Sequence, residues 1–178
     1  MSKTGKSLIN ALTEAKKKGL VTLQAATKVN KMSYQINYEA NPKSEDIQTL
    51  NDGITEQAKR KKGMKQLDFF AFFIRDEVGK IVGGCAGDNM YGGLFVGQLW
   101  VAESLRNQGH GTKLMQKAET LAKESKCNFM AVNTFDWEAL DFYKKLGFYI
   151  EFERKGFDKN STFYFLRKDL ISSHGQNI

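Results

Sequence analysis

A glycine-bearing turn directly before a helical segment is the feature that most constrains how this chain can fold. Within residues 106–114, Gly109 and Gly111 flank His110, and an apolar strand candidate at 94–101 precedes them. Apolar side chains then recur at helical spacing, at Leu114, Met115, Ala118, Leu121 and Ala122. The glycines therefore stand at a strand-to-helix junction, where unpaired N–H groups and the helix dipole attract anions.

Two familiar phosphate-binding loops do not fit this turn. A Walker A loop ends in Gly-Lys-Ser/Thr, whereas the order here is Gly111-Thr112-Lys113. A Rossmann fingerprint requires a third glycine where Leu114 stands. A turn that only connects a strand to a helix stays open as the alternative.

The remaining pattern predicts a mixed α/β domain around one central sheet. Strands are expected at 33–38, 67–75, 81–87, 94–101, 128–133, 148–153 and 162–166. Helices are expected at 44–62, after the glycine turn, and around residues 139–146 before Gly147. The segment 67–75 is so continuously apolar that we expect it to be buried on both faces.

Charge divides the chain into three parts. Residues 1–31 hold seven lysines and one acidic residue, a net charge of +6 that leaves +1 for the rest. We therefore expect a basic extension at 1–31, one domain at 32–170 and a polar tail at 171–178. The extension could adhere to polyanions or act as a solubilising tail, and it also weakly resembles an organelle presequence. A basic face on the domain, and with it specific nucleic-acid binding, is not expected.

Composition favours a cytoplasmic protein without a transmembrane segment. The longest apolar run is residues 69–74, far below the roughly 20 residues of a membrane-spanning helix. No apolar stretch follows Met1, so a secretory signal is not expected, and Cys85 and Cys127 lie far apart in apolar segments. These cysteines are expected to be small core residues, and no metal site is expected. A homodimer is left open.

Two motif blocks at a specific spacing resemble the GCN5-related N-acetyltransferase (GNAT) superfamily. The first is Leu99-Trp100-Val101 followed by Arg106-x-x-Gly109-x-Gly111, and the second is the segment 139–148, AxxFYKKLGF. The resemblance covers residues 33–170. It implies a mixed, mostly antiparallel sheet with splayed central strands, flanked by helices, and acetyl-CoA as the co-substrate.

The resemblance also assigns roles to residues. Main-chain groups of the strand would pair with the pantetheine arm, the turn would wrap the pyrophosphate, and the thioester would lie between the splayed strands. The implied cofactor-binding residues are Leu99, Trp100, Val101, Arg106, Asn107, Gln108, Gly109, His110, Gly111 and Thr112. In this family the tyrosine matching Tyr143 protonates the departing thiolate, although an ordinary buried aromatic residue would suit the same helical spacing.

Other positions depart from the family pattern. Asp136 stands where many relatives have a pantetheine-binding asparagine, and we expect it to cap the following helix. Gln98 stands where a catalytic glutamate is common, and Asp88 and Glu103 are expected to be solvated loop residues. We therefore name no general base and allow a chain of water molecules. His110 is expected to face outward.

The predicted function is acetyl transfer from acetyl-CoA to a primary amine, on a small molecule, by direct attack within a ternary complex. Acetylation of a protein N-terminus or lysine is one alternative. A non-catalytic acyl-CoA sensor is the other, favoured by the missing carboxylate at Gln98. The acceptor pocket is expected in the loops 38–46 and 88–93.

Overall fold

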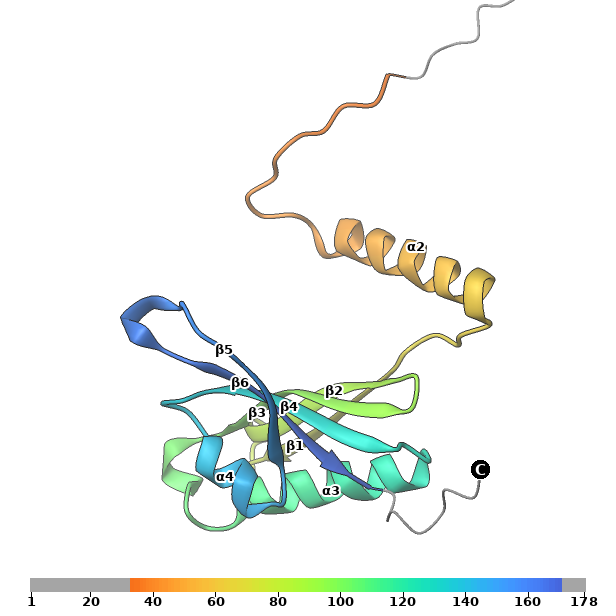
Figure 1. Ribbon diagram of the computed structural model, residues 1–178. Helices are drawn as coiled ribbons and strands as arrows, with labels where there is room; N and C mark the ends of the chain where they lie inside the picture. The colour runs from red at the N-terminus through yellow and green to blue at the C-terminus, as the bar shows by residue number, and fades with distance from the viewer. Residues whose placement is uncertain (1–32, 171–178) are drawn as a thin grey trace, which may run out of the picture. The chain divides into compact units, whose positions relative to one another are not determined.

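The computed structural model describes residues 33–170, and residues 44–170 hold a six-stranded sheet of order β1-β2-β3-β4-β6-β5 (Figure 1). Every neighbouring pair is antiparallel except β3–β4, which is parallel. The elements are α2 (Ser44–Lys62), β1 (Asp68–Arg75), β2 (Ile81–Met90), β3 (Gly93–Val101), η1 (Glu103–Leu105), α3 (His110–Glu124), β4 (Phe129–Phe135), α4 (Leu140–Lys145), β5 (Tyr149–Arg154), η2 (Asp158–Asn160) and β6 (Phe163–Asp169). This architecture confirms the expected fold class, while the expected extension at 1–31 and tail at 171–178 lie outside the described residues.

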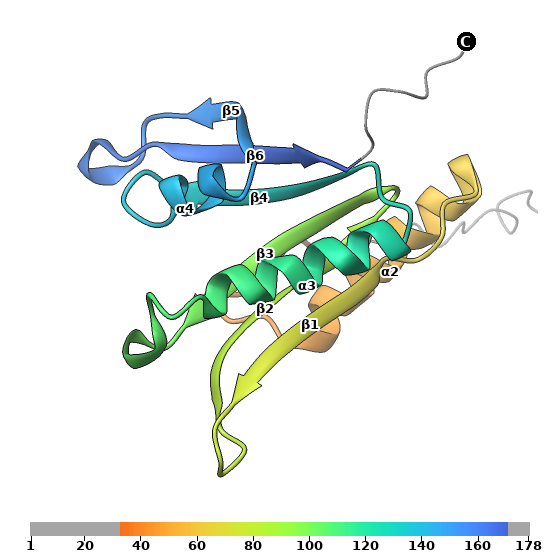
Figure 2. The same ribbon diagram turned by 90° about the horizontal axis from the view of Figure 1, so that it is seen from below.

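The two central strands separate partway along their length. β3 and β4 are paired only from 93–96 to 129–132, whereas β3 stays paired with β2 as far as Val101. Figure 2 shows the two strands diverging toward the end of the sheet where α3 begins. The edge of residues 97–101 that faces β4 therefore has no strand partner.

A β-bulge coincides with the point of divergence. Ala86 pairs with Gln98 and Gly87 pairs with Val96, so Gly97 is the extra residue of β3. A Cβ atom on Gly87 would overlap the carbonyl oxygen of Phe95, whereas a Cβ atom on Gly97 would meet nothing within 4 Å. The close approach of two backbones therefore requires glycine at position 87, and the bulge bends β3 away from β4.

The bulge generates a test with a matched control. Gly87→Ala should lower the free energy of unfolding by at least about 2 kcal/mol, because β2 and β3 must move apart to admit the methyl group. Gly97→Ala adds the same methyl group on the same bulge without a clash and should change stability by less than about 1 kcal/mol. Urea unfolding of both variants measures the difference, and equal stabilities would contradict this account of the bulge.

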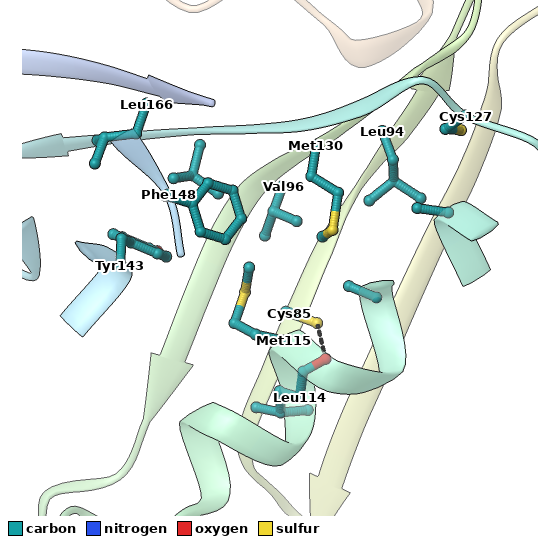
Figure 3. Packing of buried hydrophobic residues seen from close by; sticks show 13 residues of the cluster. Cys85, Leu94, Val96, Leu114, Met115, Cys127, Met130, Tyr143, Phe148 and Leu166 are labelled. Carbon is teal, nitrogen blue, oxygen red and sulfur yellow. Dashed lines mark hydrogen bonds between the residues drawn. The ribbon is translucent and has the colours of Figure 1, made fainter. Parts of the chain in front are cut away.

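The hydrophobic core lies on one face of the sheet, between the strands and the helices α3 and α4 (Figures 1 and 3). The buried apolar residues of this core are Cys85, Leu94, Val96, Leu114, Met115, Ala118, Ala122, Cys127, Met130, Val132, Tyr143, Phe148 and Leu166. Cys85 and Cys127 are both buried in this core, which confirms the expectation that they are small core residues. None of the helices within residues 33–170 is long and apolar enough to cross a membrane.

Two expectations about the first part of the chain are wrong. Residues 33–43 form no strand, and Tyr34, Ile36 and Tyr38 are exposed, because an alternating pattern becomes a strand only when its backbone has a partner. β1 is an edge strand rather than a strand buried on both faces, since alternate side chains such as Phe69 and Phe73 are exposed. The sequence does not reveal this alternation, because phenylalanine occupies exposed and half-buried positions alike.

A three-residue ion-pair network joins α3 to the sheet. The carboxylate of Glu119 lies 2.6 Å from Lys168 of β6 and 2.8 Å from Lys123 of its own helix. Burial raises the pKa of Glu119, but hydrogen bonds from Lys123 and Lys168 outweigh burial and hold the pKa below its usual value. A carboxyl group with a lowered pKa stabilises the folded state only while it is ionised.

Glu119→Gln should therefore destabilise the protein in a pH-dependent way. The loss should be about 1 kcal/mol at pH 7. It should shrink as the pH falls from about 4.5, the usual pKa of a glutamate, through the lower pKa of Glu119 in the folded protein. Urea unfolding of both proteins from pH 7 to pH 3 measures the difference. A difference independent of pH would show that packing, not charge, accounts for the effect.

Candidate functional site

The glycine turn is held open by its own backbone conformation. Asn107 and Gly109 both have left-handed φ values, 61° and 78°, and Gly109 precedes the first residue of α3. Within residues 33–170 no side chain caps this helix, which leaves its first N–H groups available to a ligand. Arg106 donates from Nε to the Val101 carbonyl at 3.1 Å, and Gln108 donates from Nε2 to the Ser104 carbonyl at 2.9 Å.

A cavity of about 850 Å³ lies between this turn and the segment that leads into α4. One wall consists of the end of β3 and the glycine turn: Leu99, Trp100, Val101, Leu105, Arg106, Asn107, Gly109, His110, Gly111 and Thr112. The opposite wall consists of Asp136, Trp137, Glu138, Ala139, Leu140, Asp141 and Phe142. The cavity therefore joins the unpaired part of β3 to the open N-terminus of α3, in a space large enough for an extended cofactor.

Nine of the ten residues predicted to bind the cofactor line this cavity. The exception is Gln108, whose side chain braces the turn instead. His110 is half-buried and lines the cavity, so the expectation that it faces outward is wrong. The role of these residues in cofactor binding stays a prediction.

The wall formed by residues 137–142 was missed by the sequence analysis. A Cβ atom on Gly111 would lie 3.3 Å from the Phe142 ring, so the turn and α4 are already in close contact. A glycine in the turn and an aromatic residue 31 positions later leave no local pattern that would link them. The second motif block of the family was the one signal that could have drawn attention to this wall.

Asp136 does not cap α4, contrary to expectation. The helix begins at Leu140, and its N-cap Ala139 donates its N–H to the Thr134 hydroxyl at 3.2 Å. Asp136 instead donates its backbone N–H to the Thr162 carbonyl at 2.9 Å. Glu138 orders the turn, since its carboxylate accepts hydrogen bonds from the Phe135 N–H at 2.8 Å and from the Thr134 hydroxyl at 3.3 Å. A turn of several residues separates β4 from α4, which displaces the helix start beyond the reach of Asp136.

Tyr143 lies beside the cavity rather than on its lining. The residue is 6% exposed, and its ring packs edge-on against Phe142 and Phe148. Figure 3 shows Tyr143 beside Phe148. Burial, together with nearby Glu138 and Cys85, raises its pKa to about 12. The hydroxyl is therefore protonated throughout the physiological pH range and can donate a hydrogen bond.

Neither Asp88 nor Glu103 lines this cavity, whose imidazole and carboxylate side chains are instead those of His110, Asp136, Glu138 and Asp141. Gln98 is exposed, Glu103 lies in η1, and Asp88, whose pKa is raised by burial, is half-buried in β2 without lining the cavity. Burial also raises the pKa of Cys85 to about 11, so its thiol stays protonated and packs in the core. Residues 33–170 hold no cluster of three side chains that could bind a metal ion.

Comparisons with known proteins agree with this architecture. The model of the acetyltransferase (GNAT) family matches residues 34–148. Blasticidin-S acetyltransferase from Streptomyces morookaense is 29% identical over 130 residues, which cover 70% of this chain and 96% of that protein. Residues 34–148, which the family model matches, include the turn and both walls of the cavity.

Solved structures share the fold. A structure from Agrobacterium tumefaciens assigned as an acetyltransferase has a TM-score of 0.70 at 23% identity, covering 76% of this chain and 99% of its own. A Bacillus anthracis structure assigned as a streptothricin acetyltransferase, in complex with acetyl coenzyme A, has a TM-score of 0.52 at 19% identity. It covers 58% of this chain and 64% of its own.

The glycine turn generates a binding test. Gly111→Leu should weaken acetyl-CoA binding by at least about tenfold, because the added side chain would enter the cavity toward Phe142 and displace a phosphate group from the helix N-terminus. Lys117→Leu places leucine on the exposed side of the same helix and serves as the control. Calorimetric titration of both variants, with thermal unfolding to confirm folding, measures the effect. Unchanged affinity in Gly111→Leu would remove the turn from the cofactor site.

Proposed function

Because this chain belongs to the GNAT acetyltransferase family, we propose that it transfers acetyl from acetyl-CoA to a primary amine of a small molecule. The blasticidin-S relative is named for a small-molecule acceptor, which supports a small molecule rather than a protein as the acceptor. The observation that carries the proposal is the cavity between the unpaired end of β3 and α4, with the glycine turn at its rim.

The residues of this cavity fit acetyl-CoA in both shape and polarity. Free N–H groups at the start of α3 and the cation of Arg106 suit the negatively charged pyrophosphate. The main chain of residues 99–101, which lacks a strand partner toward β4, suits the amide groups of the pantetheine arm. Both features lie on the same wall, in the order that an extended cofactor would require.

Acetyl-CoA supplies a thioester, so the reaction breaks a carbon–sulfur bond, forms a carbon–nitrogen bond and leaves the acceptor amine with one proton to lose. The two walls of the cavity would hold the thioester at a fixed position, so that a neutral amine can attack it directly. The amine proton would leave to water, since no side chain is assigned as its base. The positioning of the amine against the thioester would supply most of the rate acceleration in such a site.

Tyr143 is the proposed general acid for the departing thiolate. Its pKa of about 12 keeps the hydroxyl protonated, and α4 carries it at the edge of the cavity where the central strands diverge. Packing against Phe142 and Phe148 would hold the ring in one orientation, which lowers the entropic cost of proton donation. A hydroxyl in such a position donates only as negative charge develops on the sulfur.

Tyr143→Phe should reduce turnover by about 10² or more while acetyl-CoA affinity stays nearly constant. The substitution keeps the ring and its packing in the core, so the thermal unfolding temperature should change little. Tyr149→Phe removes an exposed tyrosine hydroxyl that donates to Asp169 of β6 and lines neither the cavity nor the core, and it serves as the control. Release of free thiol from acetyl-CoA with saturating amine measures turnover.

Full turnover in Tyr143→Phe, with the chemical step shown to limit the rate, would leave Tyr143 as a core aromatic residue. Binding of acetyl-CoA without thiol release in the presence of any of a broad set of amines would instead favour a non-catalytic sensor. The two results are distinguishable because the first concerns one variant and the second concerns the wild-type protein.

A further inference from the structure

A second cavity, of about 740 Å³, lies next to the first at the end of β4. Its lining comes from the end of β4 and from the loop between β5 and β6: Phe135, Asp136, Trp137, Phe157, Asp158, Lys159 and Ser161. Asp136 and Trp137 line both cavities, so the two spaces adjoin across this pair of residues. A molecule in the second cavity could therefore extend into the first, where acetyl-CoA is proposed to bind.

Aromatic rings dominate one side of the second cavity. The rings of Phe135 and Trp137 are stacked, with centroids 5.5 Å apart and an angle of 12° between their planes. Phe157 meets Phe135 edge-on, at 5.1 Å and 87°. Trp137 is 68% exposed, so a large aromatic surface is left in contact with water beside a cavity. A planar ring that stacked there would bury this surface.

Charged side chains on the same cavity favour a cation. Asp136 and Asp158 contribute two carboxylates, against the single ammonium group of Lys159. The loop that carries Asp158 has a defined shape, since Ser161 donates its N–H to the Asp158 carbonyl at 3.2 Å and the Asp136 N–H binds the Thr162 carbonyl. Stacking and charge therefore point to one kind of molecule, a planar ring with a positive charge.

We infer that this second cavity binds the acceptor, and that the acceptor is a cationic amine built on a planar ring. The ring would stack against Trp137 and Phe157, and a second positive charge would lie near Asp136 and Asp158. The amine to be acetylated would extend past Asp136 and Trp137 into the first cavity. This inference rests on the proposed acetyl transfer and adds the class of acceptor.

Three small amines of matched size test the inference. p-Xylylenediamine has a planar ring and two amino groups, benzylamine lacks the second cation, and 1,4-bis(aminomethyl)cyclohexane lacks the planar ring. With the full-length protein, kcat/KM measured by thiol release from acetyl-CoA should be at least tenfold higher for p-xylylenediamine than for either analogue. Equal values for the three amines would overturn the inference while leaving the proposed acetyl transfer intact.

Two substitutions in the second cavity test separately how it recognises the planar ring and the second positive charge of the acceptor. Phe157→Leu should remove most of the advantage of the planar ring, and Asp158→Asn should remove most of the advantage of the second cation. Both should leave acetyl-CoA affinity within twofold of the wild-type value, since neither residue lines the first cavity. Thermal unfolding confirms that each variant is folded, and Asp158→Asn, on an exposed loop, tests the site even where Phe157→Leu does not fold.

A loss of acetyl-CoA affinity in Phe157→Leu, with unchanged KM for the amine, would assign the aromatic surface to the adenine ring of the cofactor and overturn the inference. Thiol release with none of the three amines would remove both the inference and the support for acetyl transfer to small amines. Thiol release with the cyclohexane compound alone would overturn only the inference.

Discussion

The limited pairing of β3 with β4 is the constraint on which the rest of this structure depends. Only residues 93–96 of β3 are in register with β4, and the extra residue Gly97 bends the strand just beyond them. The sheet thus stays continuous at one end and opens at the other. Buried side chains from both halves, including Val96 and Val132, hold the closed end together. The open end is where both cavities are found.

The helices complete the site because of where the sheet opens. α3 begins at the rim of the opening, so its free N–H groups face the same space as the unpaired edge of β3. α4 supplies the opposite wall, and the contact between Gly111 and Phe142 sets how closely the two helices approach. The proposed cofactor site would therefore be built largely from backbone groups, while side chains around Trp137 would select the second substrate in the acceptor site that we infer.

Much of this arrangement could be predicted from the sequence, because the strongest signals concern the backbone. A strand followed by two closely spaced glycines and an amphipathic helix has few conformations, so the turn and its junction were found. The exposed face of β1 and the absence of a strand at 33–38 were not found, since burial depends on partners that periodicity does not reveal. The expectation that Asp136 caps α4 was wrong for a similar reason. The length of the turn after β4, and not the residue type, decides where α4 begins.

The inward position of the free edge of β3 has a consequence for solubility. Unpaired strand edges commonly invite other chains to add a strand, and proteins protect them with charges, proline or covering loops. Here the part of the edge at 99–101 faces the opposite wall of a cavity, so a second sheet has little room to approach it. The groups that would recognise a cofactor are thus the same groups that would otherwise promote aggregation. Their concealment between two walls lets the chain keep an incomplete sheet in its centre.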